Sequence, residues 1–283
     1  VLRVGARPIL VDVDLASRNL DAARVEAALT ERTRAVMPVH FAGLAVDMDP
    51  LNDLAAKRGL HVVEDAAHAI GTRCRGRLIG SFGELACFSF HANKNLTTIE
   101  GGAIVTADER ALTALRALRF HGQVKLEDGG YDVVSAASKY NMSDVCARIG
   151  LDQLAVLEAR NARRRELAGL YFEALAELDE LLLPARGDEG HAWHMFAVCI
   201  PFAKLGTDRK RLREALQERG IGTGVHYPAL HGLSICRGMG LRAEDFPNAE
   251  RIGRETLTLP LFPEMSDGDV ERVAAALRGV MHG

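Results

Sequence analysis

Cysteine is scarce in this chain and is poorly placed for a structural role. The five cysteines are widely spaced and odd in number, and no two form a Cys-X-X-Cys pair. Neither a zinc site nor a disulfide framework is predicted, and the spacing of the histidines predicts no metal site either. Dispersed free thiols are typical of a reducing compartment, so the expected location is the cytoplasm.

Long apolar runs and a strong charge imbalance are also missing. No uninterrupted apolar stretch is long enough to span a bilayer. The net charge is −3 and the pI is near 6.4, which gives no electrostatic reason to expect binding to nucleic acid or to a membrane surface. The basic run at 163–165 lies in a helical pattern and is interpreted as a solvated helix face.

The composition that is present suits a large globular fold. With 283 residues and 48% apolar side chains, the chain can bury a substantial core. In the first half, β-branched runs alternate with helical patterns of moderate length. We expect an α/β fold in which helices cover a mostly parallel sheet. The expected strands are 9–14, 35–40, 61–65, 85–90 and 103–106, and the expected helices are 21–30 and 50–59.

The second half has a different pattern. Apolar residues recur every three or four positions from 167 to 178, which predicts a long amphipathic helix. A strand at 193–201, a helix at 208–218 and a final apolar helix face from Val270 follow. We therefore expect a large cofactor-binding domain at 1–150, then a linking helix and a smaller α+β domain at 151–283.

Lysine is rare, and one lysine occupies a notable place. The chain has six lysines among its 35 basic residues, and Lys94 follows the predicted strand at 85–90. A desolvated lysine can lose its proton and attack a carbonyl carbon, whereas an arginine cannot. Asp65 ends another predicted strand, at the edge of the sheet where open α/β folds bind ligands. This acid could be a metal ligand, a general base, the partner of a buried cation, or simply a cap or loop residue.

A lysine and an acid together suit pyridoxal phosphate. The lysine forms a Schiff base with this cofactor, and the acid keeps the pyridine nitrogen protonated, so that the ring can accept electrons. Lys94 could also move the proton between carbon atoms. Ser89, five residues earlier, offers a hydroxyl for a phosphate oxygen. The spacing alone does not make this assignment unique.

Segment 62–106, VVEDAAHAIGTRCRGRLIGSFGELACFSFHANKNLTTIEGGAIVT, resembles the cofactor core of DegT/DnrJ-type sugar aminotransferases. The similarity extends through SKYNMSD, HAWHMF and ERGIGTGVHYPALH and covers essentially the whole chain. It implies a fold-type I aminotransferase that depends on pyridoxal 5'-phosphate and works as a homodimer with shared active sites. By this resemblance Lys94 forms the Schiff base, Asp65 pairs with the pyridine nitrogen, His68 lies near the ring and its 3-hydroxyl, and Ser89 holds the phosphate.

Four further residues are implied by the same resemblance. Lys139 and Asn141, in SKYNMSD, fall where the family sends residues to the cofactor phosphate of the neighbouring subunit, and either of them could make that contact. His226 and His231, in HYPALH, fall in a loop that lines the substrate side. Simpler roles stay open, because Asn141 could cap the following helix and the two histidines could brace their loop.

The implied reaction transfers an amino group from glutamate, which leaves as 2-oxoglutarate, to a 4-keto sugar nucleotide. The motifs are most similar to those of enzymes that form UDP-4-amino-4-deoxy-L-arabinose for lipid A modification, a branch of lipopolysaccharide biosynthesis. Amination of another keto sugar nucleotide or of a keto-inositol is an alternative. Family dehydratases carry histidine in place of the lysine, so Lys94 argues against dehydration. A catalytically silent binding module is a further alternative.

The beginning of the chain differs from the family pattern. Family members carry a Ser-Gly-Thr loop that holds the phosphate at a helix N-terminus, and no such loop is visible in the sequence that starts at Val1. We expect an N-terminal segment of the enzyme to be missing. The segment HGLSICRGMG also lacks the aromatic residues often found after the HYPALH loop.

Overall fold

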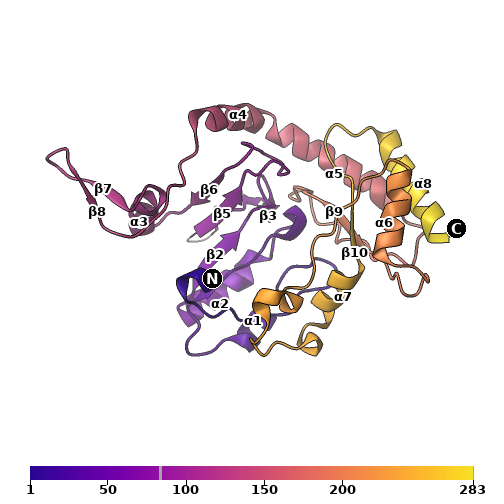
Figure 1. The fold of residues 1–283 in the computed structure, drawn as a ribbon, viewed down its shortest axis with the longest axis horizontal. Helices are drawn as coiled ribbons and strands as arrows, with labels where there is room; N and C mark the ends of the chain where they lie inside the picture. The colour runs from indigo at the N-terminus through magenta and orange to yellow at the C-terminus, as the bar shows by residue number, and fades with distance from the viewer. Residues whose placement is uncertain (83–84, 283) are drawn as a thin grey trace.

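The computed structural model describes residues 1–82 and 85–282, and it is drawn in Figure 1. The first part of the chain contains the elements η1 (Leu2–Val4), α1 (Ala22–Ala28), β1 (Ala35–Val36), η2 (Phe41–Gly43), α2 (Met48–Arg58), β2 (His61–Asp65), β3 (Arg73–Cys74), β4 (Arg77–Leu78), β5 (Leu85–Ser89) and β6 (Gly102–Val105). The middle contains α3 (Glu109–Arg119), β7 (Gln123–Lys125), β8 (Tyr131–Val133) and α4 (Asp144–Ala155). The last part contains α5 (Leu157–Ala174), β9 (Phe196–Cys199), α6 (Arg209–Glu218), η3 (Leu230–Gly232), η4 (Ser234–Cys236), η5 (Ala243–Asp245), α7 (Pro247–Glu255), β10 (Thr256–Leu259) and α8 (Asp267–His282).

The main sheet has the strand order β1-β2-β5-β6. β1 and β2 pair in parallel, as do β2 and β5, while β6 runs antiparallel to β5 at the edge. Helices α1 and α2 pack beside this sheet, and their apolar faces share a buried core with it. Asp21 caps α1 by accepting the backbone N–H of Arg24, and Gly59, in a left-handed conformation, ends α2. The predicted α/β class is confirmed.

One predicted strand is wrong. Residues 9–14 are extended, but no described strand pairs with them. The buried carboxylate of Asp12 in this segment accepts the backbone N–H groups of Asn248 and Ala249 in α7. Asp12 satisfies the free amides of a helix start from a distant segment. The segment therefore contacts a distant helix instead of joining a sheet.

A second core lies in the C-terminal half. β9 and β10 pair antiparallel, and α5, α6 and α8 pack against them. Tyr171 and Phe196 are fully buried and stacked with ring centroids 4.8 Å apart. The two cores are separate clusters of buried residues, one drawn from 25–79 and one from 167–281. The division at residue 150 falls within α4 and stays a prediction.

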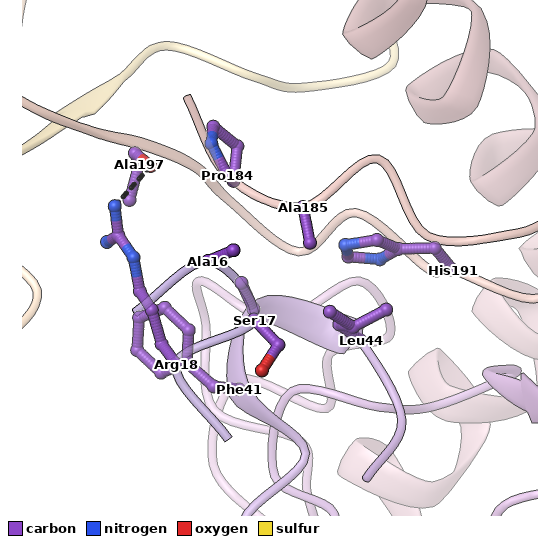
Figure 2. Close-up of a pocket in the computed structure, with 10 residues that line it drawn as sticks. Ala16, Ser17, Arg18, Phe41, Leu44, Pro184, Ala185, His191 and Ala197 are labelled. Carbon is purple, nitrogen blue, oxygen red and sulfur yellow. Dashed lines mark hydrogen bonds between the residues drawn. The ribbon is translucent and has the colours of Figure 1, made fainter. Parts of the chain in front are cut away.

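The junction between the cores is filled. Arg18, which is 6% exposed, donates from Nη2 to the carbonyl of Ala197 in β9 at 2.7 Å, and Figure 2 shows this side chain pointing toward Ala197. The cavity beside it measures about 10 Å³, which is enough for roughly one water molecule. A substrate cannot bind there.

An arm extends from the other side of the molecule. It comprises 102–156, from β6 through α3 and the β7–β8 hairpin to α4, and Figure 1 shows the hairpin projecting away from both cores. Few of its side chains are buried in this chain. Among the described residues, no helix has both the length and the apolar character needed to cross a membrane.

Candidate active site

Asp65 and Lys94 lie at the same edge of the main sheet. Asp65 is the last residue of β2, and its backbone pairs with Cys87 of the parallel neighbour β5. Lys94 follows β5 by five residues. Because the carboxyl ends of neighbouring parallel strands meet at one edge, the topology brings the acid and the amine together.

Lys94 is half-buried, and the charge of Asp65 acts on its amine. Burial lowers the pKa of the Lys94 amine, and the carboxylate of Asp65 opposes that shift without cancelling it. No hydrogen bond or ion pair joins Lys94 Nζ to another residue in the described part of the chain. The amine is thus partly desolvated and available to a reaction partner.

Asp65 is held in place from one side. Its Oδ1 accepts the backbone N–H of Ala67 at 3.0 Å, whereas Oδ2 accepts no hydrogen bond from the described residues. A carboxylate with one free oxygen at a strand end can receive a protonated ring nitrogen. This is the polar group that the pyridine ring of pyridoxal phosphate requires.

His68 lies beside these two residues. It is 9% exposed, and its pKa is lowered to about 3, first by burial and then by the charges of Lys94 and His226. Its Nδ1 accepts the backbone N–H of Ala42 at 3.4 Å. The remaining ring nitrogen, Nε2, therefore carries the hydrogen and faces the hydroxyl of Tyr227 at 3.4 Å.

Three more rings complete the cluster around His68. The His194 ring lies 4.5 Å from it between centroids, and Tyr227 stacks at 6.2 Å with an interplanar angle of 13°. Phe41 packs edge-on against His68 and Tyr227. Gly43, with φ of +93°, ends the turn after Phe41, and a Cβ there would meet the His68 carbonyl oxygen at 3.1 Å. Only glycine lets this turn approach so closely.

Tyr227, Phe41 and His194 were not among the predicted site residues. His191 has a structural role, because it is 2% exposed and stacks on Trp193 with ring centroids 3.8 Å apart. His194 reaches the site instead. Burial first, and then the charges of His68 and Lys94, hold its pKa well below the usual value.

Ser89 and His226 lie at the border of this cluster. Ser89 ends β5, and its Oγ accepts the backbone N–H of His91 at 3.4 Å. His226 is half-buried, its Nδ1 lies 2.9 Å from the hydroxyl of Thr258, and burial and Lys94 lower its pKa. Lys94 is therefore within electrostatic reach of three histidines.

The other predicted residues do not join this cluster. Lys139 and Asn141 are exposed in the arm, where Lys139 Nζ lies 5.8 Å from the centre of the Phe120 ring. Asn141 does not cap α4, because the N-cap is Ser143.

His231 packs against the start of α7 and does not join the cluster around His68. Its Nε2 is 2.9 Å from Glu250, and its ring stacks on Phe246 with centroids 5.0 Å apart. These contacts brace the loop against α7. A direct substrate contact by His231 stays a prediction.

Comparisons with known proteins identify the family of the chain. Residues 1–278 match the model of the DegT/DnrJ/EryC1/StrS aminotransferase family. The chain belongs to this family. It is 41% identical to the spore coat polysaccharide biosynthesis protein SpsC of Bacillus subtilis, over 100% of this chain and 76% of SpsC.

Two solved structures show the same architecture. S. venezuelae DesV superposes with a TM-score of 0.90 at 36% identity, over 100% of this chain and 74% of DesV. Spr1654 from Streptococcus pneumoniae, solved in a PLP form, gives 0.89 at 29% identity, over 99% of this chain and 76% of Spr1654. The predicted fold-type I architecture, the enzyme class and the cofactor are confirmed. The protein is a pyridoxal phosphate-dependent sugar aminotransferase.

Proposed function

We propose that the enzyme transfers the amino group of glutamate to the 4-keto carbon of a sugar nucleotide in the cytoplasm, as in formation of UDP-4-amino-4-deoxy-L-arabinose. The observation that carries the proposal is the half-buried Lys94 amine, with a lowered pKa and no bonded partner among the described residues, beside the carboxylate of Asp65. Such a pair suits amine chemistry on a carbonyl carbon.

Pyridoxal phosphate, when bound, supplies an aldehyde that condenses with amines and a protonated ring that accepts electrons from a breaking C–H bond. Lys94 is the residue that would hold the aldehyde, and Asp65 would hold the ring nitrogen through its free Oδ2. His68 would pack near the ring, and Ser89 would donate its hydroxyl to the phosphate. Each of these groups lies at the edge formed by β2 and β5 or in the loops that follow.

Lys94 also carries the proton in this proposal. Its lowered pKa increases the fraction of neutral amine, which can remove a proton from the donor carbon and return one to the sugar carbon. The neighbouring histidines do not compete for that proton, since the pKa of His68 is about 3 and that of His194 is well below its usual range. The mobile proton therefore stays on Lys94.

A homodimer would complete the site. Apolar side chains on the arm are exposed: Phe120 38%, Tyr131 66%, Val145 72%, Leu151 61% and Leu154 55%. Apolar patches of this kind mark protein interfaces. We propose that the arm packs against a second copy of the chain and carries Lys139 or Asn141 toward the cofactor phosphate of that copy.

The HYPALH loop and the similarity to SpsC bear on the choice of substrate. The HYPALH loop places His226 within electrostatic reach of Lys94, in keeping with a role on the substrate side, and we propose that His231 holds this loop in place. SpsC is a spore coat polysaccharide biosynthesis protein, which supports a product destined for a cell-surface polysaccharide. The 4-amino-arabinose product and its use in lipid A modification are the most specific form of the proposal.

The test uses the purified enzyme with pyridoxal phosphate, glutamate and a panel of keto sugars. Mass spectrometry follows the change from ketone to amine in 4-keto sugar nucleotides, 3-keto sugar nucleotides and a keto-inositol. We expect amination of 4-keto substrates, with formation of 2-oxoglutarate. Reaction of a 3-keto sugar or a keto-inositol while every 4-keto substrate stays unchanged would contradict the substrate assignment.

A further inference from the structure

A chain of buried amides connects α5 to the site. Asn161 of α5 is fully buried and donates from Nδ2 to the carbonyl of Ile70 at 3.1 Å. Its Oδ1 accepts Nδ2 of Asn95 at 2.9 Å. The same Nδ2 of Asn95 also donates to the carbonyl of Ala192 at 2.8 Å. Asn95, the residue after Lys94, is thus clamped between two acceptors.

These acceptors determine which way the amides face. A backbone carbonyl can only accept, so Asn161 must present its Nδ2 to Ile70 and its Oδ1 to Asn95. Asn95 must in turn direct its own Nδ2 to Asn161 and Ala192. The Oδ1 of Asn95 is then left as an acceptor, 3.1 Å from Nδ1 of His194.

This arrangement assigns the tautomer of His194. Because Asn95 Oδ1 only accepts, Nδ1 of His194 must carry the hydrogen. The groups that face His194 are His68, Lys94, Arg164 and His226, and their charges add to burial in lowering its pKa. The imidazole is neutral, and a neutral imidazole with a hydrogen on Nδ1 has a free lone pair on Nε2.

The backbone of His194 is fixed as firmly as its ring. Its N–H donates to the carbonyl of Ala42 at 2.8 Å. Arg164, which is 6% exposed, donates from Nη1 to the carbonyls of Trp193 at 3.2 Å, His194 at 3.4 Å and Leu261 at 2.8 Å. Trp193 itself has a left-handed φ of 44°, a conformation that persists only where its surroundings hold it.

We propose that Asn95 is a positioning residue that acts through His194 and holds this ring in the tautomer with hydrogen on Nδ1, so that its Nε2 lone pair is an acceptor among the side chains around Lys94. The inference rests on the proposed role of Lys94. A neutral ring at this place adds no positive charge to the site. A protonated His194 would instead be a second cation in the site and would repel the charged form of Lys94.

The direct test is ¹⁵N NMR of histidine-labelled protein without cofactor, because the ring nitrogens report the tautomer. His194→Gln assigns the His194 signals by their loss. We expect a protonated Nδ1 and an unprotonated Nε2 that do not change across neutral pH. A hydrogen on Nε2, or a protonated ring at neutral pH, would overturn the proposal without any reference to activity.

Two substitutions of Asn95 sharpen the result. Asn95→Asp keeps an acceptor for Nδ1 but adds a charge that favours the imidazolium, so the His194 resonances should begin to titrate in the neutral range. Asn95→Leu removes the acceptor, and we expect kcat to fall about tenfold or more with the glutamate KM little changed. Asn93→Leu is the matched control, since Asn93 is exposed in the same loop and bonds His91. We call this action of Asn95 on the tautomer of His194 the relay. An unchanged His194 titration in Asn95→Asp would count against it.

The proposed function and the relay fail in different ways. If Lys94 is not the catalytic amine, Lys94→Ala keeps transaminase activity while the His194 tautomer stays as assigned. If the relay is wrong, the tautomer differs while Lys94→Ala is inactive. The NMR result on the unaltered protein remains decisive even where an Asn95 variant does not fold.

Discussion

The junction between the two cores buries polar side chains, whereas the arm at 102–156 exposes apolar ones. At the junction, Asn95, Asn161 and Arg164 are each at most 6% exposed. In the arm, Tyr131 and Val145 are exposed by 66% and 72%. Both regions depart from the usual distribution of residues between core and surface, in opposite directions.

The difference shows what each region does. A buried polar group costs free energy unless it is hydrogen-bonded, so the hydrogen bonds that Asn95, Asn161 and Arg164 make at the junction hold these side chains in single orientations. Covering exposed apolar area with a partner removes it from water, which lowers the free energy. The junction therefore sets the geometry of the site within one chain, and the arm supplies the surface on which two chains would meet.

The largest expected effect comes from removing the amine of Lys94, the residue before Asn95. In Lys94→Ala, transamination should fall by about a thousandfold or more, because nucleophile and proton carrier are lost together. Steady-state formation of 2-oxoglutarate measures the effect. Lys57→Ala, at an exposed residue of α2 outside the arm, is the control and should stay within about twofold. Comparable rates for the two variants would remove Lys94 from the chemistry.

The junction can also be destabilised by removing the buried guanidinium of Arg164. Arg164→Ala leaves three buried carbonyl groups without their donor, and each loss costs about 1–3 kcal/mol. We expect the free energy of unfolding in urea to drop by about 3 kcal/mol or more. Arg165→Ala is the matched control, because its partner Glu158 is exposed and a surface ion pair contributes about 0–1 kcal/mol. Equal stability of the two variants would mean that the buried network contributes little.

The arm is tested by placing charges on its apolar face. The double variant Leu151→Asp and Leu154→Asp puts two carboxylates on one side of α4, and the proposed dimer should dissociate about a hundredfold more readily. Sedimentation velocity measures this, and circular dichroism checks that α4 still forms. Ile235→Asp, at a residue that is 67% exposed outside the arm, is the control. A double variant that keeps its dimer mass would place the interface elsewhere.

The smallest expected effect is a dependence of folding stability on pH, which arises from buried histidines. The pKa of His68 and of His191 is lowered to about 3 in the folded protein from an ordinary value of 6.5. As pH falls, the unfolded chain takes up these protons first, so their contribution to stability is complete above 6.5 and is lost between 6.5 and about 3.

Each such histidine lowers the free energy of unfolding by up to about 1.4 kcal/mol per pH unit in that window. Urea unfolding at several pH values between about 7.5 and 5 measures the slope. His191→Gln removes one such group and should give a shallower slope. An identical slope in that variant would show that His191 does not stay neutral in the folded protein.

The sequence predicted well where chemistry and topology coincide. Strand ends and residue types were enough to place Asp65 and Lys94 at one edge, because parallel strands align their carboxyl ends. The helices at 21–30, 50–59 and 208–218 were recognisable from their caps and periodicity. The β-branched run at 9–14 was wrongly predicted as a strand, because Asp12 binds the start of a distant helix and no described strand pairs with this segment.

The missed part of the site depends on contacts between distant segments. His194 joins His68 because Ala42 and Arg164 hold its backbone and Asn95 holds its ring. No local pattern encodes such a meeting. The apolar residues of the arm were likewise invisible as a surface, because a sequence shows which side chains are apolar but not which of them the fold leaves uncovered.

The most direct test asks which lysine holds the cofactor. The protein is incubated with pyridoxal phosphate, reduced with borohydride and digested, and mass spectrometry locates the phosphopyridoxyl group among the six lysines. We expect this group on the peptide that contains Lys94, and we expect no such group on that peptide in Lys94→Ala. Stoichiometric modification of any other lysine, with Lys94 unmodified, would contradict this expectation.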